Sequence, residues 1–137
     1  MTLYLVVDVL LLFSSVGLFE FQRLKAGAMG TLAFLLQMVG LLILIARDLA
    51  ILGPALYPVG ALIFAIGLDL FAIASWRSNT LPRWILILLI LSTLVGPIGF
   101  FSANLNGLFT ASGILFGIGF ASAGIAITLF PRSRMKT

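Results

Sequence analysis

The sequence predicts an all-α membrane protein, a bundle of five transmembrane helices forming a single domain over residues 1–137. Three observations lead to this fold class. Hydrophobic residues make up 62% of the chain and charged residues only 9%, whereas about a quarter of a typical soluble domain is charged. Five apolar runs are long enough to cross a bilayer, and the basic residues gather in alternate connections between them. A soluble fold of this composition would lack the polar surface needed to cover itself.

The five apolar runs cover about residues 3–21, 30–46, 59–76, 84–101 and 108–130. Each falls within the roughly 17 to 25 residues that a membrane-crossing helix requires. All four connections carry residues that interrupt helices, and three of them are "QRLKAGAM", "RSNTLPR" and "SANLNG". The remaining connection, "RDLAILGPALYP", is apolar enough to extend the second helix or to lie in the membrane interface.

The basic residues orient the predicted bundle. If every run crosses the membrane, one side receives Arg23, Lys25, Arg77, Arg83, Arg132, Arg134 and Lys136. Only Arg47 falls on the other side. Cytoplasmic connections carry an excess of Lys and Arg. We therefore expect the amino terminus outside, the carboxyl terminus in the cytoplasm, and a multi-pass location in the cell (inner) membrane.

The net charge of +4 does not indicate a nucleic-acid partner. The basic residues sit in short flanks between apolar runs, and such flanks contact anionic lipid headgroups. Membrane lipids are therefore the expected partners.

The chain contains no histidine and no cysteine. These absences remove the imidazole and thiolate ligands of zinc and haem, and the nucleophile–base pairs that depend on these residues. We therefore expect no enzymatic activity, no cofactor and no metal site. An apolar pigment or quinone, which needs only an apolar groove, stays an open alternative.

Asp69 lies inside the apolar run "FAIGLDLFAIASW". Counting along the helices places Gln37 and Ser92 at nearly the same depth, with Thr93 next to Ser92. A carboxylate at this depth is costly and should face the bundle. We expect Asp69 to form a hydrogen bond with Ser92, Thr93 or Gln37. These residues are either interhelical hydrogen-bonding partners or an intramembrane site that couples to protons or cations.

Asp8 lies in the opposite third of the predicted membrane-spanning region. Its expected partner is Arg47, at the outer end of the second run, because an opposite charge stabilises an ionised carboxylate. The alternative is that the first helix begins later, so that Asp8 lies near the headgroups.

The last run contains small residues every four positions, Gly113, Gly117 and Ala121. Small residues on one helix face let two backbones approach closely. This pattern predicts helix packing, and packing within the chain is favoured over packing between copies.

The stretch "WRSNTLPRWILILL", residues 76–89, places an arginine, a short polar turn and Leu-Pro-Arg-Trp before an apolar helix. It resembles a boundary that recurs in uncharacterised bacterial multi-spanning inner-membrane proteins. The resemblance implies a bacterial inner-membrane protein of unknown function and transfers no catalytic residues.

These features favour a non-enzymatic interaction or accessory subunit that assembles as a homo-oligomer or within a larger membrane complex. The alternative is a small transporter or channel protomer in which Asp69 is the proton- or cation-coupling carboxylate.

Overall fold

The computed structural model describes residues 2–101 and 106–129. The helices in these ranges are α1 (Thr2–Asp48), the short 3-10 helix η1 (Pro54–Leu56), α2 (Tyr57–Ser78), α3 (Arg83–Phe101) and α4 (Asn106–Leu129). No strand occurs within the same ranges. The predicted all-α class is therefore confirmed.

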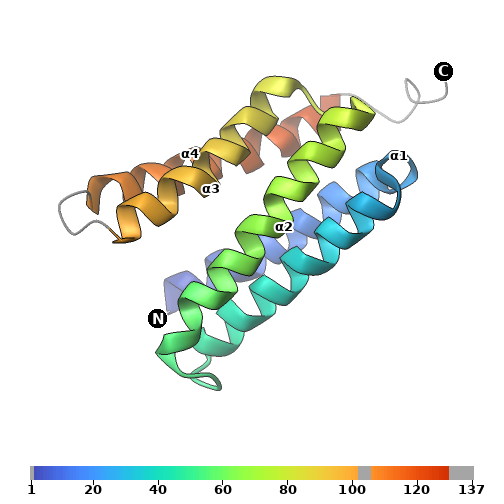
Figure 1. The fold of residues 1–137 in the computed structure, drawn as a ribbon. Coiled ribbons are helices and arrows are strands. Elements are labelled where there is room, and N and C mark those ends of the chain that lie inside the picture. Colours follow the sequence, from blue (N-terminus) through green and yellow to red (C-terminus); the bar gives the residue numbers. More distant parts are fainter. Residues whose placement is uncertain (1, 102–105, 130–137) are drawn as a thin grey trace.

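Gly27 divides α1 into two arms, residues 2–26 and 28–48. Its backbone has φ 59° and ψ −156°, close to a region that essentially only glycine adopts. Figure 1 shows the chain running back on itself at this point. Near the turn, the ring of Phe19 stacks on that of Phe34 with centroids 4.2 Å apart. The chain thus turns within the predicted connection over residues 22–29, and helical structure is interrupted there only at Gly27.

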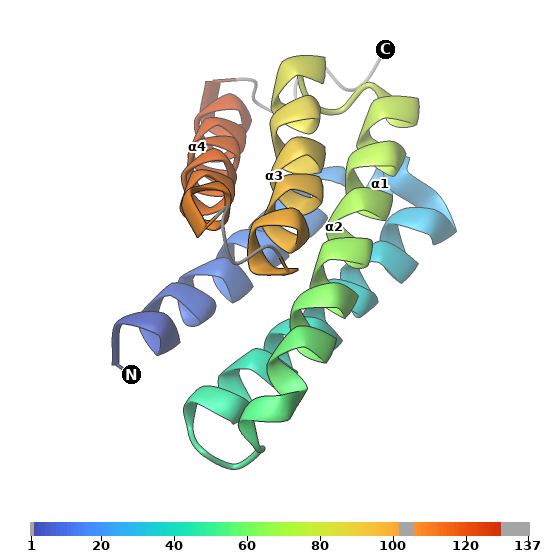
Figure 2. The same ribbon diagram turned by 60° about the vertical axis from the view of Figure 1, so that its left-hand side comes forward.

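The helices associate as two groups. Helix α2 packs against α1, and α3 packs against α4, as Figure 2 shows. The groups meet mainly where α2 contacts α3, with a smaller contact between α1 and α4. In Figure 1 the α3–α4 pair diverges from α2 toward the side on which α1 begins.

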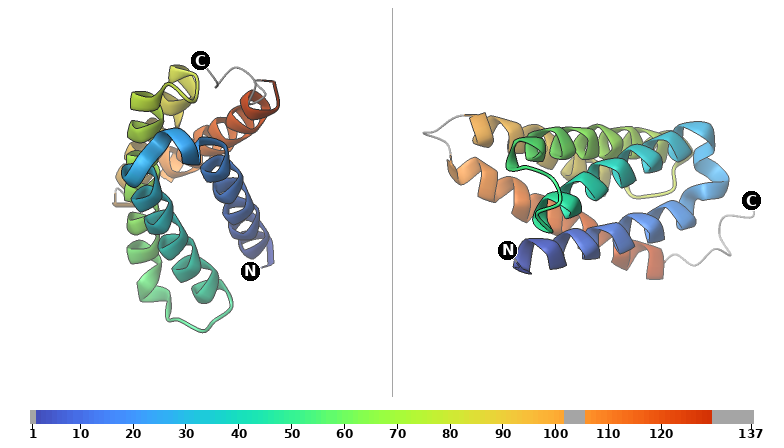
Figure 3. Two further views of the ribbon diagram at one scale, coloured as in Figure 1. Left: turned by 90° about the vertical axis from the view of Figure 1, so that its right-hand side faces the viewer. Right: turned by 90° about the horizontal axis from the view of Figure 1, so that it is seen from below.

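We call the two ends of the bundle the amino end and the turn end. The amino end holds the start of α1, the 3-10 helix η1 and the start of α4. The turn end holds the turn of α1, the connection between α2 and α3, and the end of α4 (Figures 1 and 3). The start of α1 and the end of α4 therefore lie at opposite ends.

The apolar character of these helices suits a membrane. Within the described ranges, three helical segments are long and apolar enough to cross one, Leu5–Asp48, Pro54–Ser78 and Thr110–Leu129, and a shorter apolar helix covers Arg83–Gly99. Large apolar side chains are exposed along all four helices. The fold is a helical bundle of the kind that membrane proteins form.

Glycine allows α1 and α2 to pack backbone against backbone. A Cβ atom on Gly40 would lie 2.5 Å from the backbone nitrogen of Phe64, and one on Gly67 would lie 2.6 Å from the backbone nitrogen of Gln37. Real Cβ atoms do not approach other atoms this closely. The contact between the second arm of α1 and α2 therefore depends on these two glycines.

The α3–α4 contact uses small residues in the same way. A Cβ atom on Gly96 would lie 2.9 Å from Ser112 Oγ, and one on Gly119 would lie 2.8 Å from Leu89 Cδ2. Leu89 is fully buried. It belongs to a core that also includes Leu41, Leu68, Phe71, Ile85 and Leu86.

Candidate functional site

A cleft of about 480 Å³ opens between the two helix groups in the half of the bundle nearer the amino end. All four helices contribute to its lining, which is mostly apolar. Five side chains with polar groups also line it: Asp8 from α1, Tyr57 from α2, Ser92 and Thr93 from α3, and Ser112 from α4. A large apolar cleft with a few converging polar groups is the usual form of a ligand site, and this cleft is the candidate functional site.

Helix α3 builds one wall of the cleft around Pro97. Proline has no N–H, so the backbone carbonyl of Thr93, four residues earlier, loses its usual helical donor. Ser112 Oγ donates a hydrogen bond of 2.7 Å to the carbonyl oxygen of Ser92. This bond fixes α4 against α3 where Gly96 leaves room for the serine.

Asp69 forms one of the predicted hydrogen bonds, the one with Thr93. Thr93 Oγ1 donates to Asp69 Oδ1 at 2.6 Å, and the same hydroxyl lies 2.7 Å from the carbonyl oxygen of Ile90. The other expected partners bond elsewhere. Ser92 Oγ donates to the carbonyl of Leu89 at 2.7 Å. Gln37 Nε2 donates to the carbonyl of Gly67 at 3.3 Å.

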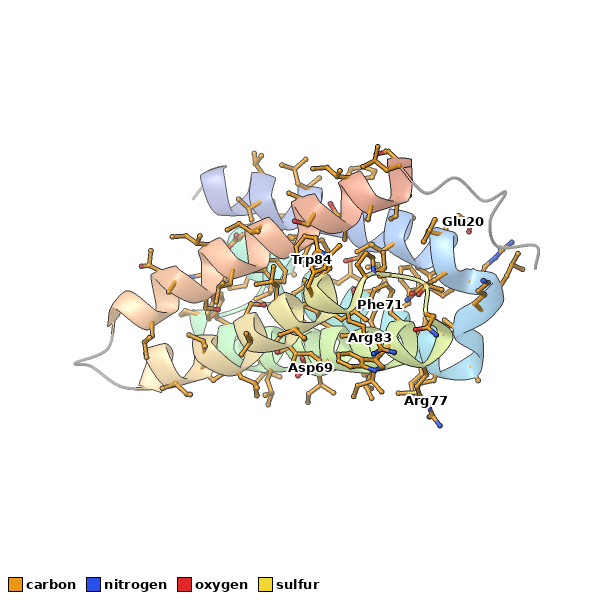
Figure 4. The ribbon with its side chains drawn as sticks, turned by 90° about the horizontal axis from the view of Figure 1, so that it is seen from above. Glu20, Asp69, Phe71, Arg77, Arg83 and Trp84 are labelled. Carbon is orange, nitrogen blue, oxygen red and sulfur yellow. The ribbon has the colours of Figure 1, made fainter. Side chains whose placement is uncertain are left out.

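Asp69 is connected to the cleft only through Thr93. Thr93 lines the cleft, whereas Asp69 does not. Figure 4 shows Asp69 on α2 at its boundary with α3, and its side chain is half-buried. The Thr93 hydroxyl is therefore the group that links the carboxyl of Asp69 to the cleft.

The predicted ion pair between Asp8 and Arg47 is not formed. Arg47 Nη1 instead donates to Asp48 Oδ1, and its guanidinium lies 5.1 Å from the centroid of the Tyr57 ring. Asp8 lines the cleft within electrostatic range of Arg47 and Asp48. Arg47 pairs with Asp48 because the two residues are adjacent in the sequence and the backbone holds them close together. Asp8 thus remains the acidic group of the cleft.

The small residues of α4 occupy two faces. Gly113, Gly117 and Ala121 are exposed, and no described atom lies within 4 Å of a Cβ built on either glycine. The buried face instead contains Gly119, Ala123 and Ala126. Gly113, Gly117 and Ala121 were predicted to pack against another helix of the same chain. The close helix contact of α4 instead uses the face with Gly119.

A polar network at the turn end was not anticipated. Gln22 is only 1% exposed, and its Oε1 accepts hydrogen bonds from Ser75 Oγ at 2.6 Å and from Thr80 Oγ1 at 2.9 Å. Its Nε2 has no partner within the described ranges. The signal was present in the sequence, since Gln22 directly follows an apolar run, but the residue was assigned to a connection.

Within residues 2–101 and 106–129, no group of three acidic side chains is placed to hold a metal ion. Comparison with known proteins finds no match to a family model, to a curated protein or to a solved structure.

Proposed function

We propose that this chain is a bacterial inner-membrane protein that crosses the bilayer five times and serves as a non-enzymatic interaction or accessory subunit. The amino terminus lies outside and the carboxyl terminus in the cytoplasm. The occupant of its interaction surface is a transmembrane helix, supplied by a second copy or by another subunit of a larger complex. The exposed small-residue face of α4 carries the proposal.

Helix lengths support five crossings. Each arm of α1 exceeds the about 20 residues that a spanning helix needs. Helix α3, with 19 residues, falls within the range of roughly 17 to 25. The turn at Gly27 makes α1 a pair of crossings, and this places the start of α1 and the end of α4 at opposite ends of the bundle.

The basic residues support the orientation. Arg23, Lys25, Arg77 and Arg83 belong to the turn end, whereas Arg47 belongs to the amino end. By the positive-inside rule the turn end faces the cytoplasm. The other cations on which the orientation was predicted, Arg132, Arg134 and Lys136, lie outside the described residues.

The exposed face of α4 supports the role in assembly. Gly113, Gly117 and Ala121 are joined on this face by Gly124, whose added Cβ would also meet no described atom within 4 Å. A face this flat gives little contact to mobile acyl chains but lets another helix backbone approach closely. Among the described residues, α4 packs within the chain through Gly119, Ala123 and Ala126, and Gly113 borders the cleft. Gly117, Ala121 and Gly124 therefore remain available to a partner.

We expect Gly117→Leu to release the partner while leaving the fold intact. A Cβ at this position has no described neighbour within 4 Å beyond its own stretch of helix, whereas a leucine there holds an approaching helix away from α4. The measurement is native mass spectrometry of the protein purified from its own membrane in mild detergent. The original chain should retain a second copy or another subunit, and the variant should appear as a monomer.

Gly17→Leu is the matched control. Gly17 is also exposed on a helix, and a Cβ there also meets nothing within 4 Å, but it lies outside the α4 face. This variant should retain the partner. A monomeric original chain, or equal loss from both variants, would contradict the proposal.

A second candidate function is proton or cation transport, and the cleft favours it. The cleft reaches Thr93, whose hydroxyl is hydrogen-bonded to Asp69. An intramembrane carboxylate next to a cleft is a common coupling group in transport proteins. In this function Asp69 exchanges the proton or cation, and Thr93 connects it to the cleft.

Under this second function, Asp69→Asn should abolish proton flux in vesicles containing the purified protein. Asparagine keeps an oxygen that accepts the hydrogen bond from Thr93, but it does not ionise. The measurement is the decay of an imposed pH gradient, followed with an enclosed pH-sensitive dye. Flux equal in the two proteins, or absent from both, would remove proton transport through Asp69 without affecting the role in assembly.

A further inference from the structure

A second cavity, of about 230 Å³, lies at the turn end between α1 and α2. Its lining residues are Lys25, Ala26 and Met29 from α1, and Ala74, Arg77 and Ser78 from α2. We propose that this cavity binds the phosphate group of an anionic phospholipid. The inference rests on the membrane embedding proposed above and adds a specific lipid site to it.

Both ionisable side chains in the cavity wall are cations. Lys25 and Arg77 come from different helices, and no acidic side chain lines the cavity. Neither forms an ion pair within the described part of the chain, whereas the nearby Arg23 pairs with Glu20 at 3.8 Å between Nε and Oε2. Two cations on one cavity, with no counter-ion among the described residues, create a positive potential that attracts an anionic group.

The side chains suit a phosphate group in particular. A guanidinium donates two parallel hydrogen bonds to phosphate oxygens, and an ammonium binds them as a point charge. Figure 4 shows Arg77 projecting from the end of α2. Ser78 Oγ already donates to the carbonyl of Ala74 at 2.8 Å, so the cations provide the recognition. Met29 and the two alanines offer apolar contact to the glycerol backbone of the lipid.

The cavity lies at the level expected for lipid headgroups. Trp76, a residue type enriched at membrane interfaces, directly precedes Arg77, and the guanidinium of Arg83 lies 5.7 Å from the centroid of a Trp76 ring. Leu24, which directly precedes Lys25, is 92% exposed and offers an apolar surface for an acyl chain. Basic pockets between transmembrane helices on the cytoplasmic side bind anionic headgroups. The turn end is the side that the basic residues assign to the cytoplasm.

The test uses the full chain in neutral detergent, at about 0.3 M salt to screen non-specific attraction. Phosphatidylglycerol and phosphatidylcholine are titrated separately, and bound lipid is counted by native mass spectrometry. We expect phosphatidylglycerol to bind more tightly than phosphatidylcholine. The double variant Lys25→Gln/Arg77→Gln should bind phosphatidylglycerol roughly thirtyfold more weakly, because each cation near an anionic lipid contributes about a factor of five.

The control double variant is Arg23→Gln/Arg83→Gln, which removes the same charge from the same end but not from the cavity. It should bind phosphatidylglycerol within about threefold of the original chain, since neither Arg23 nor Arg83 lines the cavity and charges out of contact with the lipid are screened at this salt concentration. An equal loss from both variants, or no loss from the cavity variant, overturns the site. Equal binding of the two lipids overturns it as well.

Glycerol 3-phosphate distinguishes the source of the phosphate group. If it binds as tightly as the lipid, the phospholipid is overturned as the occupant. Thermal unfolding in the same detergent verifies that both variants are folded. A chain that crosses the membrane five times but shows no preference for phosphatidylglycerol would contradict this inference and leave the proposed function standing.

Discussion

Gly40→Ala is expected to lower the free energy of unfolding by about 1–3 kcal/mol, the usual cost of forcing an extra methyl group into a packed interface. The added Cβ would lie 2.5 Å from the backbone nitrogen of Phe64 and 2.7 Å from its Cα. Backbone atoms cannot rotate away as a flexible side chain does. The second arm of α1 and α2 must therefore separate along their most extensive contact.

Thermal or denaturant unfolding in detergent, followed by circular dichroism, measures this loss. Gly17→Ala is the control, because its methyl group meets no described atom within 4 Å, and alanine favours helix over glycine by up to about 1 kcal/mol. The control should be as stable as the original chain or slightly more stable. If the two variants were equally stable, the close approach at Gly40 would not contribute to holding the helices together.

Gly27→Ala is expected to be comparably damaging, for a reason that lies in the backbone itself. At φ 59° and ψ −156°, a side chain costs about 1–3 kcal/mol in strain. The helix cannot relieve this strain by becoming straight. A continuous α1 of 47 residues would extend about 70 Å, more than twice the roughly 30 Å hydrocarbon core, and would pull its second arm away from α2.

An introduced pair of cysteines measures how closely the turn at Gly27 holds the two arms of α1 together. The chain contains no cysteine, so Phe19→Cys/Phe34→Cys introduces a single possible cross-link between residues whose rings now stack. We expect oxidation to join the two arms rapidly with Gly27 present and more slowly with Gly27→Ala. Gly17→Ala in the same background should cross-link at the original rate. A Gly27→Ala protein with unchanged stability and cross-linking would show that the turn does not depend on glycine.

The approximate positions of the helices follow from the sequence because a membrane crossing demands a long apolar run. The start and end of α2, α3 and α4 lie within a few residues of the predicted runs. The turn in α1 was harder to place, since Gly27 and Gly30 both lie in or beside the expected connection. Only Gly27 takes a positive φ. Gly30 remains helical.

The side-chain partners depend on helix rotation, which apolar sequence does not specify. Ser92 and Thr93 are neighbours in sequence and point about 100° apart on a helix, and only Thr93 reaches Asp69. Helix α4 likewise offers two small-residue faces. The contact of Gly119 with Leu89 determines which face is buried. The level of a residue along its helix therefore follows from the sequence, but the direction of its side chain does not.

Asp8 shows a different limit. Its pairing with Arg47 was inferred from depth and opposite charge, whereas Asp48 was already beside that arginine in the sequence. The burial of Gln22 also could not be predicted. An amide side chain at the end of an apolar run is equally consistent with exposure to solvent and with burial against another helix. The hydroxyls of Ser75 and Thr80 are distant in sequence and converge on it only in the folded bundle.

The claim that the chain crosses the membrane five times is tested most directly by labelling single cysteines in intact cells. Leu24→Cys, Ile51→Cys, Asn79→Cys and a cysteine at position 105 sample the four connections in turn. A membrane-impermeant thiol reagent should label positions 51 and 105 from outside, and positions 24 and 79 only after the cells are made permeable. Labelling of two successive connections from the same side would contradict the account.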